Sequence, residues 1–217
     1  MINKKIIYWQ KTLTPYFLRK SLKNDQISIT STDTVLGFIG QLTLKSFEKL
    51  NSIKEDRTDK PYLIVISSQD KLKNFVQIEN IDKNIEHFIS QCWPGPVTLI
   101  FKANQQLPAF LTSATGTIAL RCPNHKPLRT VLSSFDGLFS TSANKSGKPI
   151  PTNIEEIDHT IIEKIDYLVI DKDIQSNKVV SSTILDLSSP DGTIQVVREG
   201  AYPVKELEKL YGSSFKK

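Results

Sequence analysis

The chain has 217 residues, of which 39% are hydrophobic and 24% charged. That composition supplies enough apolar material for the core of one domain and excludes a wholly disordered chain. The formal net charge of +5 is compatible with polyanionic partners such as ATP or RNA but does not choose between them. No apolar run approaches the ~20 residues of a membrane span, and no signal-peptide cleavage pattern is present. We therefore expect a cytoplasmic protein that does not associate with membranes.

Helical and extended segments alternate along the chain. Apolar residues spaced by three and four predict helices at residues 13–22, 43–54, 81–92 and 204–210. Short apolar or alternating runs predict strands at residues 26–30, 62–66, 97–101, 117–123, 137–142, 167–171, 180–187 and 193–197. This order predicts an α/β fold with a twisted, mixed, open sheet flanked by helices, in a single domain over residues 1–217.

The two cysteines and three histidines carry little functional signal. Cys92 and Cys122 do not form a CxxC pair, so we expect two reduced and mostly buried thiols. The histidines are far apart in sequence and lack the HxH or HxxxH spacing of metal ligands. These residues therefore predict neither a zinc site nor a histidine-based catalytic triad.

Four polar corners follow or interrupt the predicted strands: STDT (31–34), KEDRTDKP (54–61), STSANKSG (140–147) and VVSSTILD (179–186). Ordinary turn chemistry would explain any one of them. Together they are interleaved with Arg57, Arg121 and Arg198, three of only five arginines in a lysine-rich chain. Phosphate-binding glycine motifs and the GxSxG nucleophile are absent from the sequence. Hydroxyls, amides and fixed cations suit a reaction catalysed by positioning and charge stabilisation, such as attack at a nucleotide phosphate.

The order of these motifs resembles the YrdC-like threonylcarbamoyl-AMP synthases. STDTVLGF is similar to their [PS]TDTVYGL segment, KEDRTDKPYLIVI to their KxRxxxKPL loop, and WPGPVTLIF to their WPGPxT turn. GTIALRCPNH and STSANKSGKP resemble their xxVAVRxPxH strand and TSANxSGxP signature, and SSTILDL with VVREGA resembles their PSTVxD and xxRxGA endings. The matches run from about residue 26 to residue 202 and look like the single-domain form of the family.

The resemblance implies synthesis of threonylcarbamoyl-adenylate and pyrophosphate from L-threonine, bicarbonate and ATP. The product would pass to a downstream tRNA threonylcarbamoyl transferase for N6-threonylcarbamoyladenosine modification, and Mg²⁺ would arrive with ATP, with no dedicated protein site. The positions implied for threonine binding are Thr32, Thr34, Arg121, Thr141 and Ser182. Those implied for ATP binding are Arg57, Lys60, Thr117, Ser142, Asn144 and Arg198. Lys54 and Arg57 are the implied catalytic residues.

The chain departs from the family pattern in four places. Ser31 replaces the usual proline, Leu36 the usual aromatic residue, and Val65 a histidine found in many relatives. These changes are expected to loosen the threonine pocket. KEDR also places two residues, where the pattern has one, between the lysine and the arginine. A carboxylate beside a triphosphate would repel it. We therefore expect the loop to bulge, with Asp56 outward and Arg57 inward; the alternative is that both are solvated loop charges.

Two other functions fit the same resemblance. One is an RNA-binding protein without synthase activity, which should interleave exposed aromatic residues with its basic residues; no such run stands out in the sequence. The other is a module that adenylates carbamoyl groups. The set of Thr32, Thr34, Arg121, Thr141 and Ser182 favours threonine over a bare carbamoyl group.

Overall fold

The computed structural model describes residues 5–55, 61–172 and 180–216, and its helices begin where the sequence supplies capping groups. The hydroxyl of Thr43 and the carboxylates of Asp82 and Asp158 accept hydrogen bonds from the first turns of their helices, while Pro15 opens the first helix. The helices are α1 (Thr14–Lys23), α2 (Leu44–Lys54), α3 (Lys83–Cys92), α4 (Lys126–Leu132), α5 (His159–Lys164) and α6 (Val204–Tyr211).

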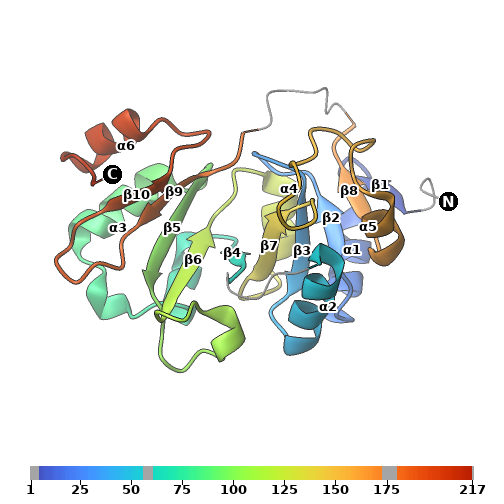
Figure 1. Cartoon of the computed structure of the whole chain (residues 1–217), viewed down its shortest axis with the longest axis horizontal. Coiled ribbons are helices and arrows are strands. Elements are labelled where there is room, and N and C mark those ends of the chain that lie inside the picture. The colour runs from blue at the N-terminus through green and yellow to red at the C-terminus, as the bar shows by residue number, and fades with distance from the viewer. Residues whose placement is uncertain (1–4, 56–60, 173–179, 217) are drawn as a thin grey trace.

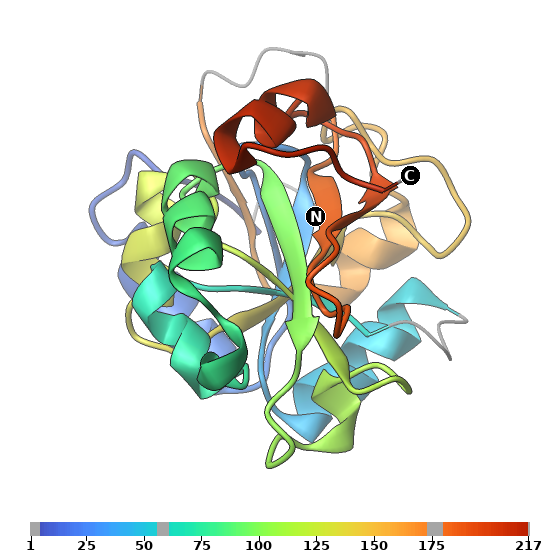
Figure 2. The ribbon, with the colours of Figure 1, turned by 90° about the vertical axis from the view of Figure 1, so that its left-hand side faces the viewer.

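One mixed sheet of ten strands organises the described residues, in the order β1-β8-β2-β3-β7-β4-β6-β5-β9-β10 (Figure 1). The strands are β1 (Ile6–Tyr8), β2 (Ser28–Thr30), β3 (Gly37–Gln41), β4 (Leu63–Val65), β5 (Val97–Lys102), β6 (Thr117–Arg121), β7 (Leu138–Ser142), β8 (Leu168–Ile170), β9 (Thr183–Asp186) and β10 (Gln195–Arg198). The sheet is twisted, and helices lie on both sides of it (Figure 2).

The pairing register brings several strand ends to one edge of the sheet. Leu99 of β5 pairs with Leu120 of β6 in antiparallel fashion, and Val97 of β5 pairs with Thr183 of β9 in parallel. The end of β6 and the beginnings of β5 and β9 therefore lie close together. Arg121 lies at this edge, at the end of β6. The corner at residues 31–34, which contacts Arg121, follows β2, and three strands (β3, β7 and β4) separate β2 from β6 in the sheet.

Apolar residues alternate between two core clusters along the central strands. Ile39, Val65 and Leu138 pack with the apolar sides of α1 and α4. Their neighbours Phe38, Ile64 and Phe139 belong to the larger cluster, which includes residues of α2, α3, α5 and α6. The buried strands are therefore apolar on both faces.

The mixed α/β sheet and most of its elements are confirmed. The segments predicted at 13–22, 43–54 and 81–92 form α1, α2 and α3, and each predicted strand appears, usually one or two residues shorter. The sequence analysis missed β1, β3, α4 and α5. These elements have three to seven residues, which is too short for a periodic apolar pattern to emerge.

Both thiols are reduced and buried, as expected. Burial raises the pKa of Cys92 to about 12 and that of Cys122 to about 11, so both remain protonated near neutral pH. Within residues 5–55, 61–172 and 180–216, no helix is long and apolar enough to cross a membrane.

Candidate functional site

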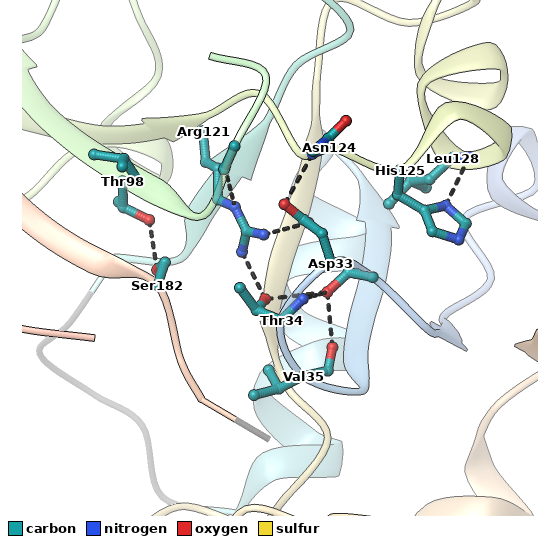
Figure 3. Close-up of polar contacts among 12 residues, drawn as sticks. Asp33, Thr34, Val35, Thr98, Arg121, Asn124, His125, Leu128 and Ser182 are labelled. Carbon is teal, nitrogen blue, oxygen red and sulfur yellow. Dashed lines mark hydrogen bonds and ion pairs between the residues drawn. The ribbon is translucent and has the colours of Figure 1, made fainter. Parts of the chain in front are cut away.

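Arg121, the last residue of β6, is the centre of the polar site (Figure 3). Its side chain is 6% exposed, and three of its N–H groups are spent within the protein. Nε donates to the Gly95 carbonyl (3.1 Å), Nη1 to the Thr34 hydroxyl (2.8 Å), and Nη2 to the Asp33 carboxylate. The second oxygen of Asp33 accepts the backbone N–H of Asn124 at 2.9 Å. The guanidinium is thus held rigidly between a strand end and two loops.

The corner at residues 31–34 is folded by its own threonines. The Thr32 hydroxyl donates to the Val35 carbonyl (2.9 Å) and accepts the Thr34 N–H (3.1 Å), a local turn typical of hydroxyl residues. The two threonine hydroxyls also lie 3.1 Å apart. Because Thr32 donates to Val35, the Thr34 hydroxyl donates to Thr32. A directed chain of hydrogen bonds therefore runs from Arg121 through both threonines.

Arg198, the last residue of β10, is near enough for its positive charge to act on Arg121. Burial is the main cause that lowers the pKa of Arg121, the Asp33 carboxylate opposes it, and the positive charge of Arg198 lowers it further. Burial also lowers the pKa of Arg198. Two cations near each other, only one of them paired with a carboxylate among the described residues, favour an anionic ligand between them.

Ser182 connects Arg198 to the sheet. Its hydroxyl shares a 2.8 Å hydrogen bond with that of Thr98, and its carbonyl accepts Nε (3.2 Å) and Nη2 (2.8 Å) of Arg198. The backbone of Gly200 passes directly beneath, because an added Cβ would lie 2.2 Å from the Ser181 carbonyl oxygen and 2.6 Å from that of Ser182. Only glycine permits this close approach.

The loop after β7 is built around Lys54, the last residue of α2. Lys54 is 3% exposed, and its ammonium donates to the carbonyls of Ser142 (2.9 Å) and Asn144 (2.6 Å). The Ser142 hydroxyl donates to the Asn144 side chain, whose amide in turn donates to the carbonyls of Lys145 (3.0 Å) and Lys148 (2.6 Å). Lys54 and Asn144 thus shape this loop from its two sides.

Cavity volume does not by itself identify the site. A cavity of about 850 Å³ lies at the end of β5 and β6 remote from Arg121, lined by residues such as Lys102 and Gly116. A cavity of about 470 Å³ lies beside Asn144 and is lined also by Lys145 and Lys148. No group of three or more His, Cys, Asp or Glu within the described part of the chain is arranged to hold a metal ion.

A family model for the Sua5, YciO and YrdC proteins, described as telomere recombination, matches residues 20–200. The chain belongs to this family. A relative from Methanocaldococcus jannaschii is 32% identical over 195 residues, 89% of this chain and 88% of that protein. A threonylcarbamoyl-AMP synthase of Pyrococcus abyssi is 27% identical over 213 residues, 97% of this chain but only 60% of that protein.

Solved structures of the Sua5, YciO and YrdC family share the fold. Sua5 of P. abyssi, crystallised with L-threonine, superposes with a TM-score of 0.83 at 26% identity, over 98% of this chain and 62% of that one. YciO of E. coli superposes with a TM-score of 0.79 over 94% of this chain and 98% of that one, and at 19% identity it shows the fold alone. The predicted YrdC-like fold is confirmed.

The residues that the family pattern assigned to threonine gather around Arg121 to different degrees. Thr34 touches Arg121 directly, and Thr32 touches Thr34. Ser182 does not contact Arg121 in the described residues; its carbonyl binds Arg198, whose charge acts on Arg121. Thr141 lies within β7, paired with Phe38 across the sheet. Their roles toward threonine stay predictions.

The residues assigned to ATP are more dispersed. Ser142 and Asn144 share one loop, and Arg198 lies at the end of β10. Thr117 begins β6, four residues before Arg121 and so roughly 13 Å from it, with its hydroxyl bonded to that of Ser113 at 2.7 Å. Arg57 and Lys60, with Asp56 and the expected bulge, lie outside the described residues.

The three substitutions expected to loosen the threonine pocket are all buried. Ser31 is 2% exposed, and its hydroxyl accepts the indole N–H of Trp9 (3.1 Å) while donating to Asp171 (2.7 Å). Leu36 is 6% exposed, and its carbonyl accepts the N–H of Ala143 (3.0 Å). Val65, 2% exposed, packs into the core formed with α1 and α4.

Sequence analysis did not name Asp33, Gly95, Thr98 or Asn124 as site residues. Asp33 and Gly95 bind Arg121, Thr98 binds Ser182, and Asn124 binds Asp33. Asp33 stands inside the STDT corner and Gly95 inside WPGP, so both were visible as parts of motifs. Asn124 and Gly95 act through backbone atoms. Sequence patterns do not report backbone contacts of this kind, because any residue type can make them.

Replacing Asn144 by alanine should lower both stability and ATP affinity. The variant loses the hydrogen bonds of this side chain to two loop carbonyls and to the Ser142 hydroxyl, worth about 0.5–1.5 kcal/mol each. Each kcal/mol lost corresponds to about 2–4 °C in melting temperature. Thermal denaturation and calorimetric titration with ATP check this. A lower melting temperature with unchanged ATP affinity would make Asn144 a turn residue only.

Proposed function

We propose that the chain is a threonylcarbamoyl-AMP synthase, which forms threonylcarbamoyl-adenylate and pyrophosphate from L-threonine, bicarbonate and ATP for tRNA modification. The family membership and the synthase relative of P. abyssi at 27% identity support this proposal. The observation that carries it is the Arg121 centre. Three of the five guanidinium N–H groups are spent on Gly95, Thr34 and Asp33, which leaves one on each terminal nitrogen for a carboxylate.

In this proposal Arg121 binds the carboxylate of threonine, and Thr32, Thr34, Thr141 and Ser182 surround the rest of that substrate. The threonine amine adds bicarbonate and loses water to become a carbamate. A carbamate oxygen then attacks the α-phosphorus of ATP, forming a P–O bond while the bond to pyrophosphate breaks. The chain contributes position and positive charge rather than a nucleophile.

The ATP side of the proposed site combines described and undescribed residues. Arg198, Ser142, Asn144 and Thr117 would contact ATP, together with the catalytic pair Lys54 and Arg57 and with Lys60. The cavity of about 470 Å³ beside Asn144 is lined by Lys145 and Lys148 but also by Glu156 and Asp158, so its charge does not by itself favour a nucleotide. Because Lys54 donates to two loop carbonyls, its proposed contribution includes holding Ser142 and Asn144 in place. Mg²⁺ would arrive on the phosphates of ATP and spread their charge.

The most informative experiment incubates the protein with ATP, isotope-labelled bicarbonate and each of several amino acids, followed by mass analysis of the products. The proposal predicts that a labelled adenylate forms with threonine and with none of the other amino acids. A labelled product without any amino acid would instead support the carbamoyl-adenylating alternative.

One observation favours RNA binding as a second candidate function. No run that interleaves aromatic and basic residues stands out in the sequence, but the structure exposes two aromatic residues of α1 beside lysines. Tyr16 and Phe17 are 55% and 42% exposed, and Lys20 and Lys23 share the outer stripe of the helix with Tyr16 at i, i+4 and i+7. Stacking rings beside cations are typical of single-stranded RNA sites.

Fluorescence anisotropy with a labelled single-stranded RNA tests this second function. Binding should fall with rising salt and should weaken in Tyr16→Ala, with Tyr167→Phe as the control. Equal binding by the wild type and Tyr16→Ala would exclude α1 as the RNA surface.

A further inference from the structure

The corner at residues 31–34 is tethered behind the Arg121 centre by a carboxylate that no family motif includes. Asp171 directly follows β8, and β8 is the parallel neighbour of β2, whose end leads into Ser31. The backbone N–H of Ser31 donates to the Val169 carbonyl (2.9 Å), so the two chain segments leave the sheet side by side. The Ser31 hydroxyl then donates to Oδ2 of Asp171 at 2.7 Å.

The same carboxylate oxygen also binds His125. Nδ1 of His125 accepts the N–H of Leu128 (3.1 Å) and caps α4, so the ring proton lies on Nε2, which donates to Asp171 at 3.1 Å. The side chain of His125 is 11% exposed and that of Asp171 30%. A partly buried carboxylate with two donors is a stronger tether than a neutral acceptor.

These contacts close a ring through the active corner. Asn124 precedes His125 in the chain, and its N–H donates to the Asp33 carboxylate that holds Arg121. Residues 124–125 therefore hold the corner at two points, at Asp33 directly and at Ser31 through Asp171. If either contact is lost, only one of them still fixes the distance between Thr34 and Arg121.

We propose that Asp171 is a positioning residue of the Arg121 centre, which holds the 31–34 corner in register with the guanidinium. The inference rests on the proposed function, because it assigns the corner to threonine. Ser31 itself cannot touch threonine from its buried position, and its hydroxyl is spent on Trp9 and Asp171. The serine in place of the family's usual proline gives the corner a hydroxyl group, and that hydroxyl donates its hydrogen bond to Asp171.

The test compares Asp171→Ala and the milder Asp171→Asn with the wild type. Asp171→Ala should raise the dissociation constant for threonine about tenfold and leave that for ATP within about twofold, because misplacement of the corner affects only groups facing threonine. Hydrogen exchange of the peptide amides at residues 31–36 should become faster, while exchange in α2 stays unchanged. Ser31→Ala should show the same pattern, and combining it with Asp171→Ala should add little further effect.

Asp191→Ala serves as the matched control. Its carboxylate also accepts a serine hydroxyl (Ser189, 2.7 Å) and a backbone N–H (Thr193, 2.9 Å), in a turn remote from Arg121. If Asp171→Ala behaves like this control, losing stability but not threonine affinity, the positioning role is refuted. If the wild type binds no threonine, the proposed function fails. The exchange measurement then decides on its own whether Asp171 orders the corner.

Discussion

Arg121→Lys should weaken threonine binding by about 1–3 kcal/mol while leaving ATP binding nearly unchanged. Lysine keeps the charge but has no planar fork. It cannot satisfy Gly95, Thr34 and Asp33 together and still offer two parallel donors to a carboxylate. Calorimetric titration of the variant with each ligand separately measures the effect.

Arg198→Lys is the reciprocal control for this prediction. Arg198 is near Arg121 and is assigned to ATP, so its lysine variant should lose ATP affinity and largely keep threonine affinity. If Arg121→Lys weakens both ligands equally, Arg121 is a structural residue or belongs to the nucleotide. The two variants together therefore test the assignment of Arg121 to threonine and of Arg198 to ATP.

Gly200→Ala should reduce turnover at least about tenfold. The new methyl group would meet the backbone of Ser181 and Ser182 at 2.2–2.6 Å, so one of the two segments must move. The N–H of Gly200 donates to the Thr183 hydroxyl (2.9 Å), and Ala201 donates to the Ser181 carbonyl (2.8 Å), so the movement also strains these bonds. Overpacking of this kind costs about 1–3 kcal/mol of stability. Steady-state kinetics and thermal denaturation measure the two effects.

Gly192→Ala separates the effect at the site from general strain. Gly192 has a φ of +72°, so alanine is strained there by about 1 kcal/mol, but nothing lies within 4 Å of the added methyl group. We expect reduced stability with normal turnover. Normal turnover in Gly200→Ala as well would show that Ser182 and Arg198 tolerate displacement.

The sequence predicted those parts of the fold in which local pattern and tertiary packing agree. The stripe through Phe88, Ile89 and Cys92 became the buried side of α3, and the apolar run at 97–101 became β5. By contrast, α4 begins with His125 as its capping residue, an uncommon choice, and β1 has only three residues. The packing of Leu128 and Leu132 against α1 stabilises α4, and that contact is not visible in the local sequence.

The candidate site was predicted as a set of motifs but not as a geometry. STDT and the strand ending in Arg121 were each recognised, yet their contact depends on the register and twist of strands that are not adjacent in the sheet. The expectation that Ser31 loosens the threonine pocket shows what a local sequence pattern does not report. The hydroxyl of Ser31 is held by hydrogen bonds with Trp9 and Asp171, which lie 22 and 140 residues away in sequence.

The central claim is tested most directly by pyrophosphate release from ATP, measured with threonine and bicarbonate present together, each alone, and neither. The proposed synthase should release pyrophosphate only when both are present, because the attacking group is the carbamate made from them. Equal release without any amino acid would contradict the account and exclude threonine as the substrate held by Arg121.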